Sequence, residues 1–208
     1  MTAPKVIGLD LSLTATGIAS NLGWCQTIGE TGITTRALDD RLDAIDRLTR
    51  DILIAIGGGR GNWPALVAIE IPAFSRSGAG SHERSALWWR VVRSLRRREV
   101  PVAEVSIQQR MRYATGKGSA SKGAVIDAVA RRLPMFATGG DDNCADAAIL
   151  AAMAADHLGH PLAQMPATHR AALDAVTWPE MPAPVVVPYQ AGRHTDLPTI
   201  DLPAQEAS

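Results

Sequence analysis

Cysteine is scarce in this chain, which contains only Cys25 and Cys144. Two cysteines so far apart form neither the close spacing of a zinc site nor a disulfide framework, so we expect a reducing compartment. Phenylalanine and tyrosine are equally rare, at two residues each. The chain also lacks a recognisable signal peptide and an apolar run long enough to cross a membrane, so we expect a cytoplasmic protein with no membrane partner.

Net charge is absent as well, because 21 Lys and Arg balance 21 Asp and Glu. The global charge therefore indicates no particular partner. Along the chain the charges are uneven, and residues 76–122 contain eleven Lys or Arg against three Glu. A basic stretch of this kind is typical of a surface that contacts a polyanion, although solvated helix faces give the same pattern.

What the sequence does contain is a regular succession of apolar segments, since 46% of its residues are hydrophobic. Short apolar runs predict strands at residues 5–10, 15–21, 24–31, 65–70 and 101–105. Apolar residues at helical spacing predict helices at residues 38–56, 82–98, 106–113 and 121–133, and another that starts near Asp142. This order predicts an α/β fold, in which a mixed sheet carries helices on both faces.

The composition changes toward the C-terminus, where seven prolines follow residue 165. No lasting periodicity remains there apart from a possible short helix at 168–176. We therefore expect one folded domain over residues 1–160 and a Pro-rich, largely flexible extension over residues 161–208.

Two of the predicted strands end on a carboxylate, Asp10 after "KVIGL" and Glu70 after "ALVAI". The helix that starts near Asp142 adds Asn143 and Asp146, and residues three or four apart lie on one helical face. Carboxylates that converge repel one another unless a cation lies between them, and oxygen ligands suit Mg²⁺. Each acid also has a structural explanation, because Asp is common at turns and helix starts. Asp146 fits that explanation least, since it lies among alanines on a face that we expect to be buried.

A Gly-rich loop, "ATGKGSASKGAV", leads into the helix at 121–133. Lys122 in this loop can supply positive charge beside a phosphate group. The alternative is that Lys122 is an ordinary surface lysine.

The sequence contains four motifs that together span most of residues 5–158, namely "IGLDLSLTATGIA", "VAIEIPAF", "ATGKGSASKGAV" and "DDNCADAAILAA". They resemble, in the same order, the first strand and turn, the second acidic strand, the basic glycine loop and the final acidic helix of RuvC-type Holliday junction resolvases. The phage-type branch of that family is the most similar. The resemblance implies a ribonuclease H-like fold and metal-dependent cutting of branched DNA.

The resemblance also implies which residues bind metal. Asp10, Glu70 and Asp146 match the family's metal-binding acids. The family carries a further ligand three residues before the last acid, and this chain has Asn143 at that position. Asn143 offers a carbonyl oxygen without charge, so Asp142 is the alternative ligand.

DNA contacts are implied in the same way. Lys122 matches the loop lysine implicated in catalysis, and Phe74 matches a loop aromatic that wedges against bases at the junction crossover. The alternative is that Phe74 packs beneath its own loop. We expect DNA contacts from five residues in all, Phe74, Arg76, Arg112, Lys117 and Lys122.

The helix at 82–98 resembles the family's dimer helix. A four-way junction has approximate two-fold symmetry, so a two-fold homodimer is suited to making paired cuts in it. We expect the apolar seam between two copies to consist of Leu87, Trp88, Val91 and Leu95. The alternative is that these side chains face the core of their own chain.

The leading hypothesis is an endonuclease that resolves Holliday junctions or other branched DNA by paired symmetric nicks. It would use Mg²⁺, with Mn²⁺ able to substitute, and act at the nucleoid or, if a phage encodes it, in the host cytoplasm. One alternative is a non-catalytic branched-DNA-binding protein on the same fold, and another is an actin-like or sugar-kinase-type nucleotide binder. A single-strand or RNA-processing nuclease on this fold is a further alternative.

Overall fold

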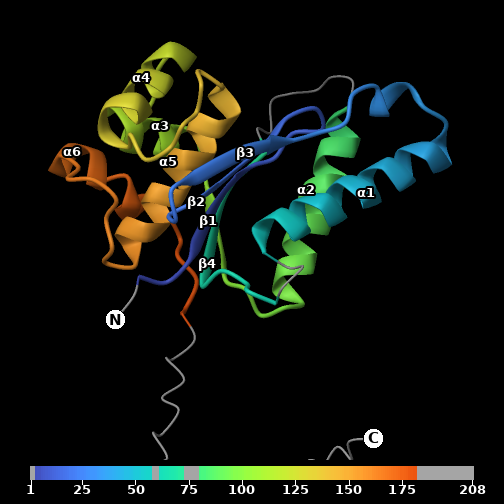
Figure 1. The fold of residues 1–208 in the computed structure, drawn as a ribbon, viewed down its shortest axis with the longest axis horizontal. Helices are drawn as coiled ribbons and strands as arrows, with labels where there is room; N and C mark the ends of the chain where they lie inside the picture. The colour runs from blue at the N-terminus through green and yellow to red at the C-terminus, as the bar shows by residue number, and fades with distance from the viewer. Residues whose placement is uncertain (1–2, 58–60, 73–79, 182–208) are drawn as a thin grey trace, which may run out of the picture.

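The computed structural model describes residues 3–57, 61–72 and 80–181 (Figure 1). Its strands are β1 (Val6–Asp10), β2 (Thr16–Ser20), β3 (Trp24–Ile28), β4 (Leu66–Glu70) and β5 (Val102–Val105). Its helices are α1 (Leu38–Ile56), α2 (Ser81–Arg96), α3 (Ile107–Thr115), α4 (Lys122–Arg132), α5 (Asp142–His157) and α6 (Ala167–Arg170), with 3-10 turns at Ile33–Thr35 and Leu173–Ala175. The predicted strands and helices are confirmed, with shifts of a few residues at their ends.

The strands form one mixed sheet in the order β3-β2-β1-β4-β5. β1, β2 and β3 form an antiparallel meander, whereas β4 and β5 run parallel to β1. In the parallel pair Leu9 lies opposite Ile69, so Asp10 and Glu70 both follow at the carboxyl edge of the sheet. The two strand-end acids are therefore neighbours because of the sheet register.

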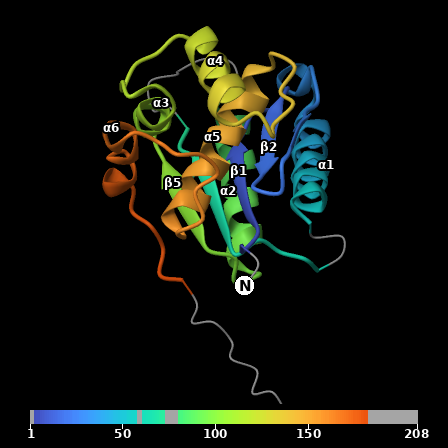
Figure 2. The ribbon, with the colours of Figure 1, turned by 60° about the vertical axis from the view of Figure 1, so that its left-hand side comes forward.

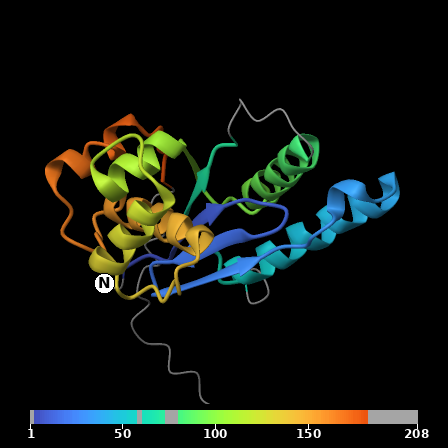
Figure 3. The same ribbon diagram turned by 90° about the horizontal axis from the view of Figure 1, so that it is seen from above.

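Helices cover both faces of the sheet, as the sequence predicts (Figures 1 and 3). α1 and α2 pack on one face against Ile7, Leu9 and Ile69, which alternate along β1 and β4. α5 lies on the other face, where α3 and α4 pack against it. The period of two along the strands thus divides the apolar residues between two cores.

The backbone of α5 packs directly against the backbone of β1 and β2. A Cβ atom added to Gly8 of β1 would lie 2.1 Å from the carbonyl oxygen of Ala147, and one added to Gly17 of β2 would lie 2.1 Å from that of Asn143. Alanine-rich sequence on the helix and glycine on the strands are what permit this contact. The position of the first turns of α5 is therefore set by main-chain packing.

The expected apolar seam on α2 is wrong. Leu87, Trp88, Val91 and Leu95 are buried in the core beneath α2, so they cannot form the seam between two copies. The apolar side of α2 faces the sheet and packs against Leu9 and Ile69 in the same core.

The C-terminal part of the fold extends beyond residue 160, where the sequence placed its end (Figure 2). Met165, Leu173 and Val176 are buried against α5 and its neighbours, and the Trp178 ring stacks on His157 at 4.0 Å between centroids. Residues 161–181 therefore belong to the packed fold, because spaced apolar side chains anchor a segment that lacks periodicity. Residues 182–208 of the expected extension lie outside the described residues.

No helix among the described residues has both the length and the apolar character needed to span a bilayer.

Candidate functional site

Acidic side chains from three elements line one pocket of about 380 Å³ at the carboxyl edge of β1 and β4. Asp10 ends β1, Glu70 ends β4, and Asp142, Asn143 and Asp146 come from the first turns of α5. The structure thus brings together all five residues that the sequence predicted as metal ligands.

The N-cap of α5 determines the positions of the helix acids. Asp141 is the N-cap of α5, and its carboxylate accepts hydrogen bonds from the backbone N–H groups of Asn143 at 2.8 Å and Cys144 at 3.1 Å. The helix therefore begins at Asp142, and Asp146 follows one turn later on the same side. The cap role suggested for an acid at this helix start thus belongs to Asp141.

The turn after Asp10 is closed by Thr16. Its hydroxyl donates to the carbonyl oxygen of Ser12 at 2.6 Å and accepts from the Ser12 N–H at 3.0 Å. On the other side of the pocket, the Trp88 indole of α2 donates to the Glu70 carbonyl oxygen at 3.1 Å. These bonds hold the backbone on both sides of the acids.

Arg110 of α3 inserts its guanidinium between two of the acids. Its Nε donates to Glu70 and its Nη1 to Asp146, and only 4% of the residue is exposed. Ser106 and Gln109 form a capping box that fixes the start of α3, so Arg110 lies in the first turn of a well-anchored helix. Arg110 was not among the residues expected at the site, because a single arginine in a helix carries no pattern that marks it as a site residue.

The acids strongly affect one another. Burial raises the pKa of Asp10 to about 7, and repulsion from Glu70 and Asp146 adds to this effect. Burial also raises the pKa of Asp146 to about 6, against the attraction of Arg110. The positive charge of Arg110 therefore does not fully offset the burial and mutual repulsion of the carboxylates.

Lys122 lies at the exposed rim of the pocket and pairs with Asp142. This hydrogen bond raises the pKa of the lysine and lowers that of the aspartate. The 82% exposure of the Lys122 side chain leaves its ammonium free to reach an incoming anion.

The carboxylate oxygens of the pocket are suitable ligands for a metal ion, but their present arrangement does not form a complete metal site. The described residues contain no group of three His, Cys, Asp or Glu side chains that could hold a metal ion as they stand. In this arrangement Arg110 is bound to two of the acids, Glu70 and Asp146. The donor set itself fits a hard divalent cation, since buried carboxylates that repel one another are what such an ion neutralises.

Other predicted contacts are less central. Arg112 and Lys117 are exposed on α3 and in the loop that follows it, and neither lines the pocket. Phe74 and Arg76 lie outside the described residues. Arg84 of α2 does line the pocket, and together with Arg110 it is a basic residue that sequence reasoning passed over.

Comparison with known proteins gives the fold a name. No protein-family model and no curated protein matches the chain. Two solved structures of RuvC from Thermus thermophilus are similar to it, at 18% and 16% sequence identity and a TM-score of 0.53 in each case. Each comparison covers 78% of this chain and 99% of the other, and the second structure is of RuvC in complex with Holliday junction substrate. The chain therefore has a RuvC-like fold of the ribonuclease H-like class, as the four motifs predicted.

Proposed function

We propose that this protein is a metal-dependent endonuclease that cuts branched DNA, with four-way junctions as its main substrate. The observation that carries the proposal is the convergence of Asp10, Glu70 and Asp146 on one pocket of the fold. The substrate of the similar RuvC structure supports the choice of a junction.

Asp10, Glu70 and Asp146 are the residues that would hold a divalent ion, Mg²⁺ or Mn²⁺, with Asn143 or Asp142 as an additional oxygen donor. When bound, such an ion supplies positive charge beside the scissile phosphate and activates the attacking water. Lys122 would then release Asp142 and bind a phosphate oxygen from the rim of the pocket.

Arg110 takes a positioning role in this proposal. Without an ion it neutralises Glu70 and Asp146 and keeps both side chains turned into the pocket. With an ion present, its guanidinium becomes available to a phosphate, because guanidinium groups bind carboxylate and phosphate oxygens in the same way.

A second copy of the chain completes the proposal, because two symmetric cuts need two sites. The inner side of α2 is used by the core, so the interface must use its outer side. Trp89 is the large apolar residue there, with 65% of its surface exposed. Replacing Trp89 with Gln is expected to shift the protein toward a monomer in analytical ultracentrifugation, and an unchanged dimer would exclude this side of α2.

The central experiment uses Asp10→Asn on a synthetic four-way junction. We expect the wild-type protein to nick the junction with Mg²⁺, and the variant to bind the junction without cutting it. Asp43→Asn is the matched control, since Asp43 is an exposed carboxylate of α1 outside the pocket. Cutting by Asp10→Asn at the wild-type rate would overturn the assignment.

The second candidate is a branched-DNA-binding protein without nuclease activity. It is favoured by Asn143 at the position of an expected acid and by Arg110 between the remaining acids. Junction binding by the wild-type protein without any nick in Mg²⁺ or Mn²⁺ would establish it.

A further inference from the structure

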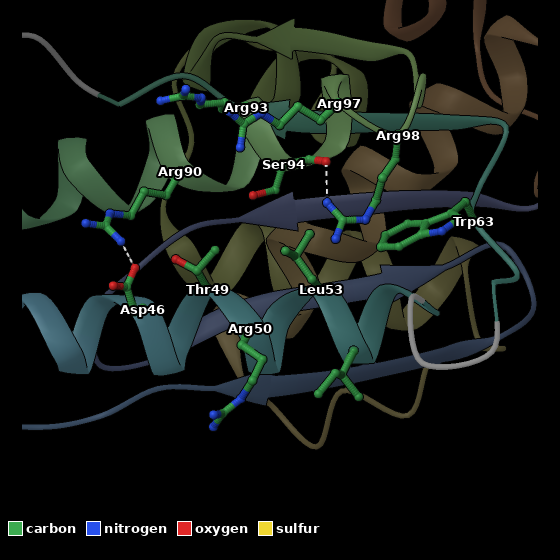
Figure 4. Close-up of a pocket in the computed structure, with 11 residues that line it drawn as sticks. Asp46, Thr49, Arg50, Leu53, Trp63, Arg90, Arg93, Ser94, Arg97 and Arg98 are labelled. Atoms are coloured by element: carbon green, nitrogen blue, oxygen red, sulfur yellow. Dashed lines mark hydrogen bonds and ion pairs between the residues drawn. The ribbon is translucent and has the colours of Figure 1, made fainter.

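A second and larger pocket lies between the C-terminal halves of α1 and α2, outside the acidic site (Figure 4). Its volume is about 670 Å³. The ion pairs Arg41–Glu83 and Asp46–Arg90 join the two helices in the same order along both, so the helices run parallel and form the walls of a groove. We call this pocket the arginine groove, and its lining residues are Asp46, Thr49, Arg50, Leu53, Ile54, Trp63, Arg90, Arg93, Ser94, Arg97 and Arg98.

The charge of the arginine groove is one-sided, because five arginines and a single carboxylate line it. Arg90 pairs with that carboxylate, and Arg50 pairs with its neighbour Asp51. Arg93, Arg97 and Arg98 are exposed and form no ion pair with a carboxylate of residues 3–57, 61–72 or 80–181. The groove thus presents three guanidinium groups whose charge is not neutralised by the described part of the protein.

One of these groups is held in place. The Arg98 guanidinium lies 4.9 Å from the centroid of the Trp63 ring, and its Nη1 donates to the Ser94 carbonyl oxygen at 2.8 Å (Figure 4). A guanidinium fixed over an indole loses less conformational freedom when it binds an anion. The Arg98 guanidinium, at the end of the groove next to Trp63, is therefore preorganised for a negatively charged ligand.

Two simpler explanations account for part of these arginines. Cations near the C-terminal end of α2 stabilise the helix dipole, which explains Arg93 and Arg96 in its last turn. The bond from Arg98 to the Ser94 carbonyl oxygen caps the same helix end, but neither effect explains why the arginines gather around a groove. A second copy of the chain seated over the groove itself would bring its arginines against those of the partner, which is unfavourable, so the interface proposed at Trp89 has to leave the groove open.

We propose that the arginine groove binds the phosphate backbone of a DNA arm whose branch point lies at the acidic pocket. This inference rests on the proposed function, because it takes DNA as the ligand of both pockets. Both pockets border α2, but on opposite sides of it: Ser81, Arg84, Ser85 and Trp88 line the acidic pocket, and Arg90, Arg93 and Arg97 line the groove, so a duplex that reaches both pockets has to cross over the exposed side of α2. Ser85 and Ser94 are about 14 Å apart along the helix axis, a distance that roughly four base pairs of duplex span.

Duplex DNA fits this surface better than an acidic protein segment. The duplex carries one negative charge per about 1.7 Å of its axis, and its rigid backbone presents that charge without an ordering cost. Arg93 and Arg97 are one helical turn apart, so both can contact successive phosphates of one strand. An acidic peptide remains as an outcome that the experiment distinguishes.

The test compares two double variants of the full chain in binding to a labelled four-way junction, with EDTA present to prevent cutting. Arg93→Gln/Arg97→Gln removes two groove charges. Arg131→Gln/Arg132→Gln removes two exposed charges from α4, on the other face of the sheet, and serves as the control. We expect the slope of log K against log salt concentration to fall by about 2 for the groove variant, because each phosphate contact contributes about 0.9. The control is expected to keep the wild-type slope.

A second readout locates the DNA. Trp63→Phe is expected to remove part of the fluorescence quenching that the junction causes. Trp178→Phe should leave that quenching unchanged, since Trp178 stacks on His157 away from the groove. Cutting of saturating junction in Mg²⁺ is expected to proceed normally in the groove variant.

The possible failures are distinct. Absence of junction binding by the wild-type protein would overturn both this inference and the proposed function. Wild-type binding with equal slopes for the groove variant and the wild type would overturn the arginine groove alone. Loss of polyglutamate binding in the groove variant, with junction binding unchanged, would assign the groove to an acidic protein segment instead.

Discussion

Arg110, which is buried, and Asp146, which is partly exposed, form an ion pair that joins α3 to α5 across 36 positions of the chain. The same guanidinium reaches Glu70 at the end of β4. One internal cation thus stands where the carboxylates of the acidic pocket converge, and it is the group with which a divalent ion must compete.

Replacing Arg110 with Gln removes this cation. We expect the metal-free variant to lose about 3–5 kcal/mol of stability, because breaking a buried ion pair leaves uncompensated charge. Saturating Mg²⁺ should restore most of the loss, so the metal-induced rise in Tm is expected to be larger than in the wild-type protein. Differential scanning calorimetry over a Mg²⁺ titration measures both quantities.

Arg112→Gln is the control for this experiment, since Arg112 lies two positions away on the same helix and is exposed. Its Tm should respond to Mg²⁺ as the wild type does. An equal metal-induced shift in Arg110→Gln would show that Arg110 and the ion occupy different places.

The raised pKa of Asp10 predicts a pH dependence of stability. The folded state holds the proton with a pKa of about 7, against 3.8 for the ordinary carboxyl. The stabilisation by this proton is therefore complete below about pH 4 and is lost as the pH rises through 7. Asp10→Asn, which imitates the protonated form, should be more stable than the wild type at pH 8.

The advantage of Asp10→Asn should shrink on acidification by about 1.4 kcal/mol for each pH unit below 7. Metal-free unfolding curves in urea at pH 8 and pH 5.5 measure it. A constant difference between the two proteins over this range would contradict the raised pKa.

Gly17→Ala tests the contact between β2 and α5. The added methyl group would lie 2.1 Å from the Asn143 carbonyl oxygen, so the first turn of α5 must move. We expect a stability loss of about 1–3 kcal/mol from overpacking. Junction cutting should fall more than this loss explains, because Asp146 moves with the helix.

Gly123→Ala is the matched substitution, since no atom lies within 4 Å of the Cβ that it would add. Its stability should stay the same or rise by about 0.5–1 kcal/mol, as is usual for Gly→Ala within a helix. Equal effects of the two substitutions on cutting would show that the position of α5 does not limit activity.

The buried carboxylate of Asp156 provides a test of the C-terminal packing. It accepts a hydrogen bond from the Tyr113 hydroxyl at 3.0 Å and two from the Arg170 guanidinium at 2.8 and 3.0 Å. Tyr113→Phe should cost about 1 kcal/mol, and Arg170→Gln should cost more than Tyr113→Phe, because it leaves the buried Asp156 carboxylate without its cation. Urea unfolding measures both, with Arg132→Gln as an exposed control that should be neutral.

The order of elements was predictable because its signals are local and periodic. The apolar spacing of α1 and the short apolar runs of β1 and β4 reflect the faces that these elements bury. The meeting of Asp10 and Glu70 follows as well, since parallel neighbouring strands end at the same edge of a sheet. Asp146 could be added because helical spacing ties it to Asp142.

The rest depends on contacts between distant parts of the chain. The pairing of Arg110 with Glu70 spans 40 positions and leaves no periodic trace in the sequence. An amphipathic pattern likewise tells which side of α2 is covered but not whether the sheet or another molecule covers it. In the Pro-rich segment, Met165 and Val176 are anchored by a surface that forms only when α5 is in place.

The direct contact of Gly8 and Gly17 with α5 also bears on how far this sequence can drift. Because main-chain atoms meet there, the distance of β1 and β2 from the first turns of α5 is set mainly by backbone contact. Residues elsewhere in either core can be replaced, and the changes compensated by their neighbours, while the dimensions of the acidic pocket stay the same. A chain that keeps these two glycines can therefore change most of its other core residues and still hold Asp10 and Asp146 at the same separation.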